Sequence, residues 1–177
     1  MGAPEGFHPL VESVTPSLFR RALLLTHDWH LAEDLVQETV MTILTKWRHV
    51  ERADNPEAYC SQLMTNKFLS MSRKRSYHEK PDPIEVPQSV DPWPSIEAEI
   101  SVAEALSTLS PDERAVVIGR YIDDISAVDL AKHLGKTASW VRVNAHRALT
   151  KMRMDLTRDD DLVAHADQIA ASERRGR

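Results

Sequence analysis

The sequence predicts an all-α protein with two small helical domains joined by a Pro-rich flexible linker, the second domain containing a helix-turn-helix. Apolar residues recur at helical spacing in the first 75 residues and again after residue 95, and no strand-like alternation persists anywhere. Between these blocks lie five prolines without any period. The expected divisions are a first domain over 1–76, a linker over 77–94, a second domain over 95–157 and a C-terminal tail over 158–177.

The composition is that of an ordinary globular protein, with 42 % hydrophobic and 28 % charged residues. No apolar run approaches the ~18–20 residues of a membrane span, and the start "MGAPEGFHP" has no signal-peptide pattern. A cytoplasmic location without membrane contact is therefore expected. The single cysteine, Cys60, excludes an internal disulfide and a Cys-based zinc site.

The net charge of −5 at first argues against nucleic-acid binding, but its distribution does not. Residues 77–104 hold one basic residue against seven acidic ones, whereas residues 105–158 hold nine basic against six acidic. Each block also ends in a basic cluster, "SRKR" at 72–75 and "HRALTKMR" at 146–153.

The first domain is expected to contain three helices, over 7–26, over 31–49 and from Asn55 to residue 75. Asn55 can cap the third helix, with Pro56 in its first turn and Glu57 near the positive end of the dipole. The linker, if extended like polyproline at ~3.1 Å per residue, reaches about 60 Å. That length could separate the two domains by more than one turn of duplex DNA, roughly 34–36 Å.

The second domain is expected to begin with a helix over 95–109, followed by the cap "SPDE" at 110–113. Further helices are expected over 111–121, 126–134 and 137–156. Small Ala131, turn-forming Gly135 and inward Val141 are typical of a helix-turn-helix, because they permit a close crossing and a tight turn.

The second helix of this motif divides into two faces. The inward face is predicted to hold Ala138, Val141, Ala145, Ala148, Leu149 and Met152. The opposite face and its flanks can contact bases and phosphates through Ser139, Trp140, Arg142, Val143, Asn144, His146, Arg147, Thr150 and Lys151. A solvated helix face is the alternative, although Trp140 and Val143 suit it poorly.

The third helix of the first domain divides similarly. Its inward face is predicted to hold Cys60, Leu63, Met64, Phe68 and Met71, and its outward face Gln62, Thr65, Asn66, Leu69 and Arg73. The outward face leads into Lys74 and Arg75. A succession of amides, cations and aromatic residues can bind DNA whose strands are separated, because it supplies both stacking and phosphate neutralisation. The alternative is that the cations at the end of this helix only stabilise it, by interacting with the negative end of the helix dipole.

Three stretches in this order resemble the extracytoplasmic-function (ECF) sigma factors of RNA polymerase, in particular the SigE-like actinobacterial branch of the sigma-70 family. They are "LTHDWHLAEDLVQET", "NPEAYCSQLMTNKFLSMSRKRSYHE" and "ALSTLSPDERAVVIGRYIDDISAVDLAKHLGKTASWVRVNAHRAL". The resemblance implies a sigma region 2 domain, a sigma region 4 domain and no enzymatic activity or cofactor.

The resemblance also implies the partners and the site residues. The first domain would bind core RNA polymerase at the clamp helices of its beta-prime subunit, through Asp34, Gln37 and Glu38, and would open the minus-ten element, with Asn66 near the flipped base. Thr137 to Arg147 would form the recognition helix for minus-thirty-five DNA. Many members are held inactive by an anti-sigma factor, but nothing in the sequence identifies one. Where relatives often carry Gly-Thr-Val-Lys-Ser, this chain has Ser-Trp-Val-Arg-Val at 139–143, so a promoter sequence cannot be transferred.

The acidic stretch around "HLAEDLVQE" leaves three interpretations open. A metal site would use His30, Glu33, Asp34 and Glu38, but di-metal bundles need Glu-x-x-His on two helices and this chain has one His-x-x-Glu. The inward face of this helix is predicted to hold Ala32, Leu35, Val36, Thr39 and Ile43, so the metal ligands would point to solvent. A solvated charge run does not explain the apolar Met41 and Leu44 on the same outward face, whereas a protein-docking face does.

Two further alternatives concern function. Nucleophilic catalysis has little support, because Cys60 falls on an inward face and no glycine-rich phosphate loop is present. A helix-turn-helix regulator that acts without polymerase would explain the second domain but not the first.

Overall fold

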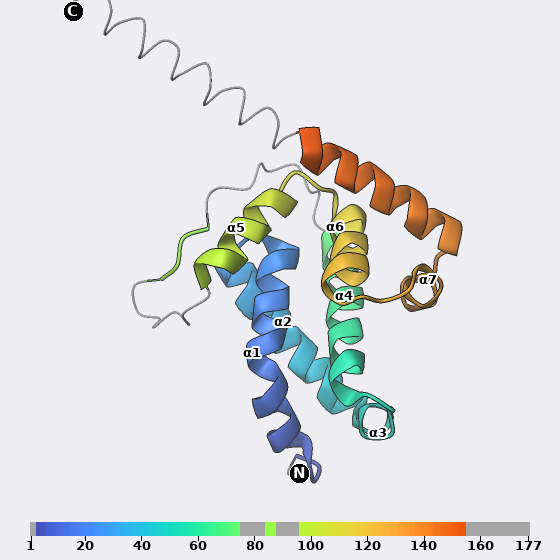
Figure 1. The fold of residues 1–177 in the computed structure, drawn as a ribbon. Helices are drawn as coiled ribbons and strands as arrows, with labels where there is room; N and C mark the ends of the chain where they lie inside the picture. Colours follow the sequence, from blue (N-terminus) through green and yellow to red (C-terminus); the bar gives the residue numbers. More distant parts are fainter. Residues whose placement is uncertain (1–2, 75–83, 88–95, 155–177) are drawn as a thin grey trace, which may run out of the picture.

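The computed structural model describes residues 3–74, 84–87 and 96–154, and all regular secondary structure among them is helical (Figure 1). The first block, residues 7–74, contains α1 (Phe7–Thr26), α2 (Trp29–Thr45), α3 (Trp47–Glu51) and α4 (Pro56–Lys74). The second block, residues 96–154, contains α5 (Ile96–Leu106), α6 (Pro111–Val117), the π-helix η1 (Ile118–Ile122), α7 (Ala127–Leu134) and a helix over 138–154. The predicted tail, Arg75 and the predicted linker other than 84–87 lie outside the described residues.

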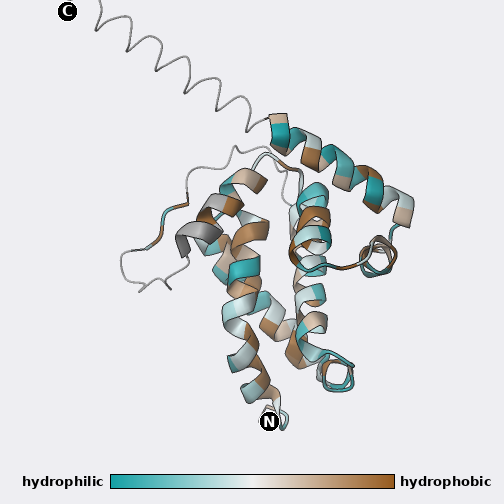
Figure 2. Ribbon diagram, viewed as in Figure 1, coloured by the Kyte–Doolittle hydropathy of each residue, from teal (hydrophilic) through white to brown (hydrophobic). Residues whose placement is uncertain are grey.

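The core of the first block lies where α1, α2 and α4 pack together, and their apolar stripes face one another (Figure 2). Leu23, Leu35 and Met64, one from each helix, are fully buried. The predicted inward face of α2 is confirmed, since all five of its residues are buried: Ala32, Leu35, Val36, Thr39 and Ile43.

Several predicted helix caps are present. The Asn55 side chain accepts from the Ala58 N–H at 3.0 Å, and Ser110 with Glu113 forms the expected capping box at the start of α6. Asp28, a carboxylate just before the stretch "HLAEDLVQE", caps α2 by accepting from the Leu31 N–H at 2.8 Å. Thus one carboxylate of the acidic stretch has a local structural role.

The helix-turn-helix is formed by α7, the turn at Gly135 and the 138–154 helix. Gly135 ends α7 with φ 64°, a left-handed conformation that favours glycine. Ala131 and Val141 are both buried between the two helices, as predicted.

The segment before this motif differs from the predicted single helix over 111–121, because α6 continues into the π-helix η1. Gly119 lies in η1 directly against Leu130 of α7: a Cβ at this position would stand 2.7 Å from one Leu130 methyl and 2.9 Å from the other. The glycine therefore permits the close approach of η1 and α7.

The two blocks pack directly on each other rather than standing apart. In Figure 1, α5 lies across the end of α1 and α6 lies beside α4, and the contacts between these helices confirm both placements. Ile84 and Val86, within the predicted linker, also pack against the core. No helix among the described residues is both long and apolar enough to cross a bilayer.

The structure corrects three predicted positions. Thr65 and Leu69, expected on the outward face of α4, are 4 % and 9 % exposed. Leu149, expected to lie inward on the last helix, is 37 % exposed. Periodicity within one helix cannot show which of its faces a second block will cover.

Candidate functional site

The outward face of α2 is the first candidate surface. Asp34, Gln37 and Glu38 are exposed, and Leu44 is half-buried. Met41 lies among them with 59 % of its surface exposed. The face therefore combines carboxylates with an uncovered apolar side chain, as protein-docking surfaces do.

Glu38 differs from its neighbours because it already has a partner within the block. Its Oε2 lies 2.5 Å from Nζ of Lys67 on α4, and this hydrogen bond lowers the pKa of the Glu38 carboxyl. Of the predicted polymerase-contacting carboxylates, Asp34 is thus the one without a recorded ion pair among the described residues.

The metal interpretation gains nothing from the geometry. His30 and Glu33 lie 3.3 Å apart on the surface of α2, but no group of three or more His, Cys, Asp or Glu side chains among the described residues could hold an ion. Cys60 is buried as predicted, and burial raises the pKa of its thiol to about 11, which disfavours the reactive thiolate.

The second candidate surface is the outward face and end of α4. Asn66, Arg73 and Lys74 are exposed and Gln62 is half-buried. Arg75, the last residue of the predicted basic cluster, lies outside the described residues. The face is only partly open, because the neighbouring Thr65 is buried.

The third candidate surface is the 138–154 helix. Its first turn is capped by Thr137, whose hydroxyl accepts from the Trp140 N–H at 3.1 Å. The predicted DNA-contacting side chains that are exposed are Thr137, Ser139, Arg142, Val143, His146, Arg147 and Lys151.

Two other predicted DNA-contacting residues take part in local contacts. Trp140 is half-buried, with the Lys136 ammonium 5.1 Å from its ring centroid. Asn144 is half-buried and its Nδ2 donates to the Trp140 carbonyl at 2.9 Å. These contacts fix the orientation of the indole at the edge of the helix.

Lys151 has a structural partner that the sequence did not indicate. Its Nζ lies 2.8 Å from both carboxylate oxygens of the buried Glu113 on α6. Burial alone would raise the pKa of Glu113, but the hydrogen bonds from Lys151 and Ser110 outweigh it and lower that pKa. Lys151 thus ties the last helix to α6.

Sequence reasoning missed Arg114, the largest fully buried side chain. Its guanidinium donates to the carbonyls of Leu106, Ser107 and Leu109, at 3.1 to 3.2 Å, and to that of Leu25 at 2.5 Å. It therefore neutralises carbonyls near the C-terminal ends of α1 and α5 together. The sequence feature that could have indicated a buried arginine is the position of Arg114 directly before the apolar run at 115–118.

Sequence reasoning also missed Arg21. From α1, its Nη2 donates to the Thr65 hydroxyl at 2.8 Å and its Nη1 lies 2.5 Å from the Asp123 carboxylate, after η1. Beside this ion pair is a cleft of about 290 Å³, lined by Gln62 and Asn66 on one side and by α7 on the other.

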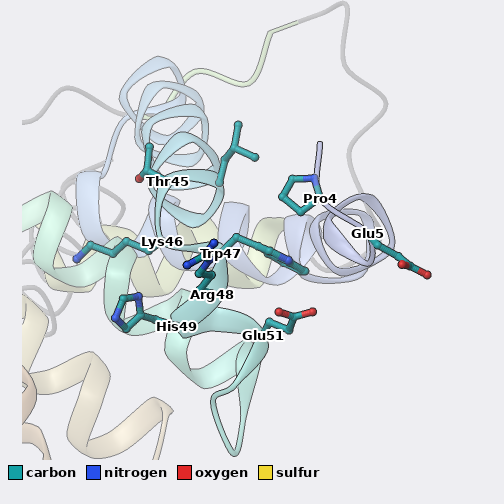
Figure 3. Close-up of a pocket in the computed structure, with 9 residues that line it drawn as sticks. Pro4, Glu5, Thr45, Lys46, Trp47, Arg48, His49 and Glu51 are labelled. Carbon is teal, nitrogen blue, oxygen red and sulfur yellow. The ribbon is translucent and has the colours of Figure 1, made fainter. Parts of the chain in front are cut away.

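A further hollow of about 530 Å³ lies beside α3 (Figure 3). Lys46, Arg48 and His49 line it together with Glu5 and Glu51, so its charges are mixed. Trp47 forms its floor and packs edge-on against Phe7, with ring centroids 5.6 Å apart. Nothing in this arrangement selects a particular ligand.

Comparisons with known proteins agree with the two-block architecture. Residues 10–77 match the sigma-70 region 2 family and residues 105–154 match sigma-70 region 4. Because the first match covers the first block, a regulator without a polymerase-binding domain is not supported.

Individual relatives are similar over most of the chain. The RNA polymerase sigma-E factor of Streptomyces coelicolor is 29 % identical over 162 residues, covering 90 % of this chain and 91 % of the relative. The ECF RNA polymerase sigma factor SigL of Mycobacterium tuberculosis is 30 % identical over 155 residues, covering 78 % and 82 %.

A solved structure shows the same fold. It is the sigma factor RpoE of Bartonella quintana in complex with the anti-sigma factor NepR, with a TM-score of 0.66, 24 % identity and coverage of 87 % of this chain and 98 % of that one. Sigma factors, the family that these matches indicate, are not enzymes. The chain belongs to the ECF family of RNA polymerase sigma factors.

Proposed function

We propose that this sigma factor docks on the beta-prime clamp helices of core RNA polymerase through the outward face of α2. The residues assigned to docking are Asp34, Gln37, Glu38, Met41 and Leu44. In the same proposal α4, with Gln62, Asn66, Arg73 and Lys74, opens minus-ten DNA together with Arg75, the residue that follows Lys74 in the sequence, and the helix-turn-helix reads minus-thirty-five DNA. The protein would act in the cytoplasm. It would be controlled by an anti-sigma factor, because the solved structure of the similar sigma factor RpoE is a complex with the anti-sigma factor NepR.

The observation that carries the docking assignment is Met41. The opposite side of α2 buries five residues in the core, yet this methionine is 59 % exposed between Gln37 and Thr45. A large apolar side chain within an exposed acidic face is explained by a partner that covers it and supplies basic groups.

The direct test is a titration of the purified chain with core polymerase, followed by in-vitro transcription from a library of promoters. A complex that initiates at selected promoters supports the proposal and yields the recognised sequence. Tight binding to duplex DNA without any polymerase complex would contradict it.

The docking face is tested with Asp34→Ala combined with Gln37→Ala. We expect polymerase affinity to fall by about tenfold or more, because the pair removes a charge and a hydrogen-bonding group from the centre of the face. The matched control is Glu12→Ala with Ser13→Ala, an exposed acidic and polar pair on α1. Equal affinity of the two double variants would show that α2 is not the docking face.

The DNA-reading face is tested with Arg142→Ala. If Arg142 pairs a base, promoter-dependent binding should weaken by about 1–3 kcal/mol and discrimination at one base pair should relax. Lys132→Ala, which removes one exposed cation from α7, is the control for charge alone. An unchanged promoter preference in Arg142→Ala would remove this residue from the set of readers.

A further inference from the structure

A lysine in the turn of the helix-turn-helix has a fixed main chain. Lys136 lies between Gly135, which ends α7 with φ 64°, and Thr137, which caps the 138–154 helix. Its N–H donates to the Ala131 carbonyl at 2.9 Å, the hydrogen bond expected where a helix ends in glycine. The main chain of Lys136 is therefore fixed relative to α7.

The side chain of Lys136 is held by the next helix. Its Nζ lies 5.1 Å from the ring centroid of Trp140, a distance at which the negative face of the indole attracts a cation. The indole is itself held in place, because Trp140 packs against the second buried cluster, which contains Leu130 and Val141. Lys136 remains exposed, so a held aromatic ring orients a cation that faces solvent.

The charge of Lys136 differs in its surroundings from that of Lys132, one helical turn earlier. Nζ of Lys132 forms an ion pair with the Asp129 carboxylate at 2.9 Å. Lys136 belongs to none of the ion pairs formed within residues 3–74, 84–87 and 96–154. A lysine ammonium has three N–H donors, so the contact with the ring leaves donors for an anion.

The position of Lys136 relative to the last helix indicates which anion it can reach. Because its ammonium lies over the Trp140 ring, it is on the side of the helix that also carries the exposed Val143 and Arg147. In helix-turn-helix proteins the first residues of the second helix approach the base edges, and phosphates border the groove that this helix enters. A cation just before the first turn is therefore placed beside a phosphate.

We propose that Lys136 contacts a backbone phosphate of minus-thirty-five DNA, and that Trp140 is the positioning residue that orients this lysine before DNA binds. The inference rests on the proposed function, in which the helix-turn-helix reads this DNA. It adds a residue outside the predicted DNA-contacting set and gives Trp140 a role that acts through the lysine. A lysine that is already oriented loses less side-chain freedom on binding than a free one.

The phosphate contact is tested by comparing Lys136→Met with Lys132→Met in the full chain bound to core polymerase. Both substitutions remove one exposed cation and keep an unbranched apolar side chain. A fluorescent duplex carrying the upstream part of a promoter selected from the library is titrated at salt concentrations from about 50 to 200 mM. The slope of log affinity against log salt reports the number of phosphates contacted.

We expect Lys136→Met to weaken binding about three- to tenfold, because a charge-assisted contact is lost. The magnitude of its salt slope should fall by about 0.9, the value for one phosphate of duplex DNA. Lys132→Met should keep the parent slope, and so should Lys136→Arg, since arginine retains the charge and also stacks on the indole. A parent slope in Lys136→Met would overturn the phosphate contact.

The positioning role of Trp140 is tested with Trp140→Leu, alone and combined with Lys136→Met. Alone, the change should weaken binding about two- to fivefold, the size of one exposed cation–π contact, with the salt slope and the base preference unchanged. In the Lys136→Met background it should have little further effect. Equal losses in the two backgrounds, or an altered preference among duplexes with single base changes, would overturn the positioning role.

A failure of the proposed function would give a different result. If the parent chain forms no complex with polymerase, the same titration is made with the full chain and the duplex alone, because a phosphate contact does not depend on base sequence. A smaller slope in Lys136→Met than in Lys132→Met would then still support the contact. Equal slopes, or no binding of the duplex by the parent chain, would overturn it.

Discussion

The first block buries an apolar core between α1, α2 and α4, whereas the second block has two charged side chains, Arg114 and Glu113, at its centre. Two ionisable side chains, Arg21 in α1 and His27 at its C-terminal cap, are buried where the first block meets the second. Arg21 forms an ion pair with Asp123, and His27 lies near Arg114. The first block is therefore held by packing. The second block and the interface combine hydrogen bonds to helix ends with apolar packing, because Leu106, Leu109 and Ile118 belong to the same buried cluster as the first block.

The largest effect is expected from Arg114→Met. The change leaves four carbonyls without their charged donor, and we expect a loss of about 3–5 kcal/mol in the free energy of unfolding of the second block. Hydrogen exchange should show lost protection in α6 and the last helix, with α2 preserved. Equal loss in α2 would mean that both blocks share one cooperative core.

The control for that variant is Arg120→Met. Arg120 donates to a single carbonyl, that of Ile125, and is only half-buried. Its removal should cost about 1 kcal/mol or less. Comparable losses in both variants would show that positive charge in the second block, rather than the carbonyl contacts of Arg114, sets its stability.

A smaller effect is expected from Gly119→Ala, which tests packing inside the second block. Helix propensity alone favours alanine by up to about 1 kcal/mol, but its methyl would overlap Leu130. We expect a net loss of about 1–3 kcal/mol in urea unfolding. The same substitution in a Leu130→Ala background should cost less, and identical costs in both backgrounds would rule out the contact as the cause.

The smallest effect is a loss of stability at acidic pH that depends on His27, at the interface between the blocks. Burial and the nearby Arg114 guanidinium lower the pKa of His27 below its ordinary 6.5, and Nδ1 has no hydrogen-bond partner among the described residues that could receive its proton. The unfolded chain therefore binds this proton more readily, so stability decreases as the pH falls below about 6.5.

His27→Asn should remove that dependence. Asparagine tolerates the left-handed φ of 54° at this position. Between about pH 7.5 and about pH 5, one such group can lower the free energy of unfolding by at most on the order of 2 kcal/mol. We expect the parent chain to lose more stability over this range than the variant does. Parallel pH profiles in urea unfolding would exclude His27 as the sensor.

The parts of the fold predicted from the sequence are those fixed by neighbouring residues. The inward face of α2, the Asn55 cap, the capping box at Ser110 and the turn at Gly135 each depend on residues within a few positions of one another. The outward position of Asp34, Gln37 and Met41 followed from the same periodicity.

The parts that were missed depend on residues far apart in the chain. Arg21 and Asp123 are separated by 102 positions, and Arg114 and Leu25 by 89. The burial of Thr65 required knowledge of where Ile125 and Leu130 of the second block lie. Lys151 has both the exposure expected of a phosphate contact and a partner in Glu113, which composition could not reveal.

The contacts of Arg114 have a consequence for reading this protein's evolution. The four acceptors of its guanidinium described above are main-chain oxygens, which every amino acid supplies. Positions 25, 106, 107 and 109 can therefore change side chain without altering the acceptors, and paired substitutions with position 114 are not needed to preserve these bonds. A search for co-varying pairs would overlook a contact that joins the two halves of the molecule, although position 114 itself should resist change.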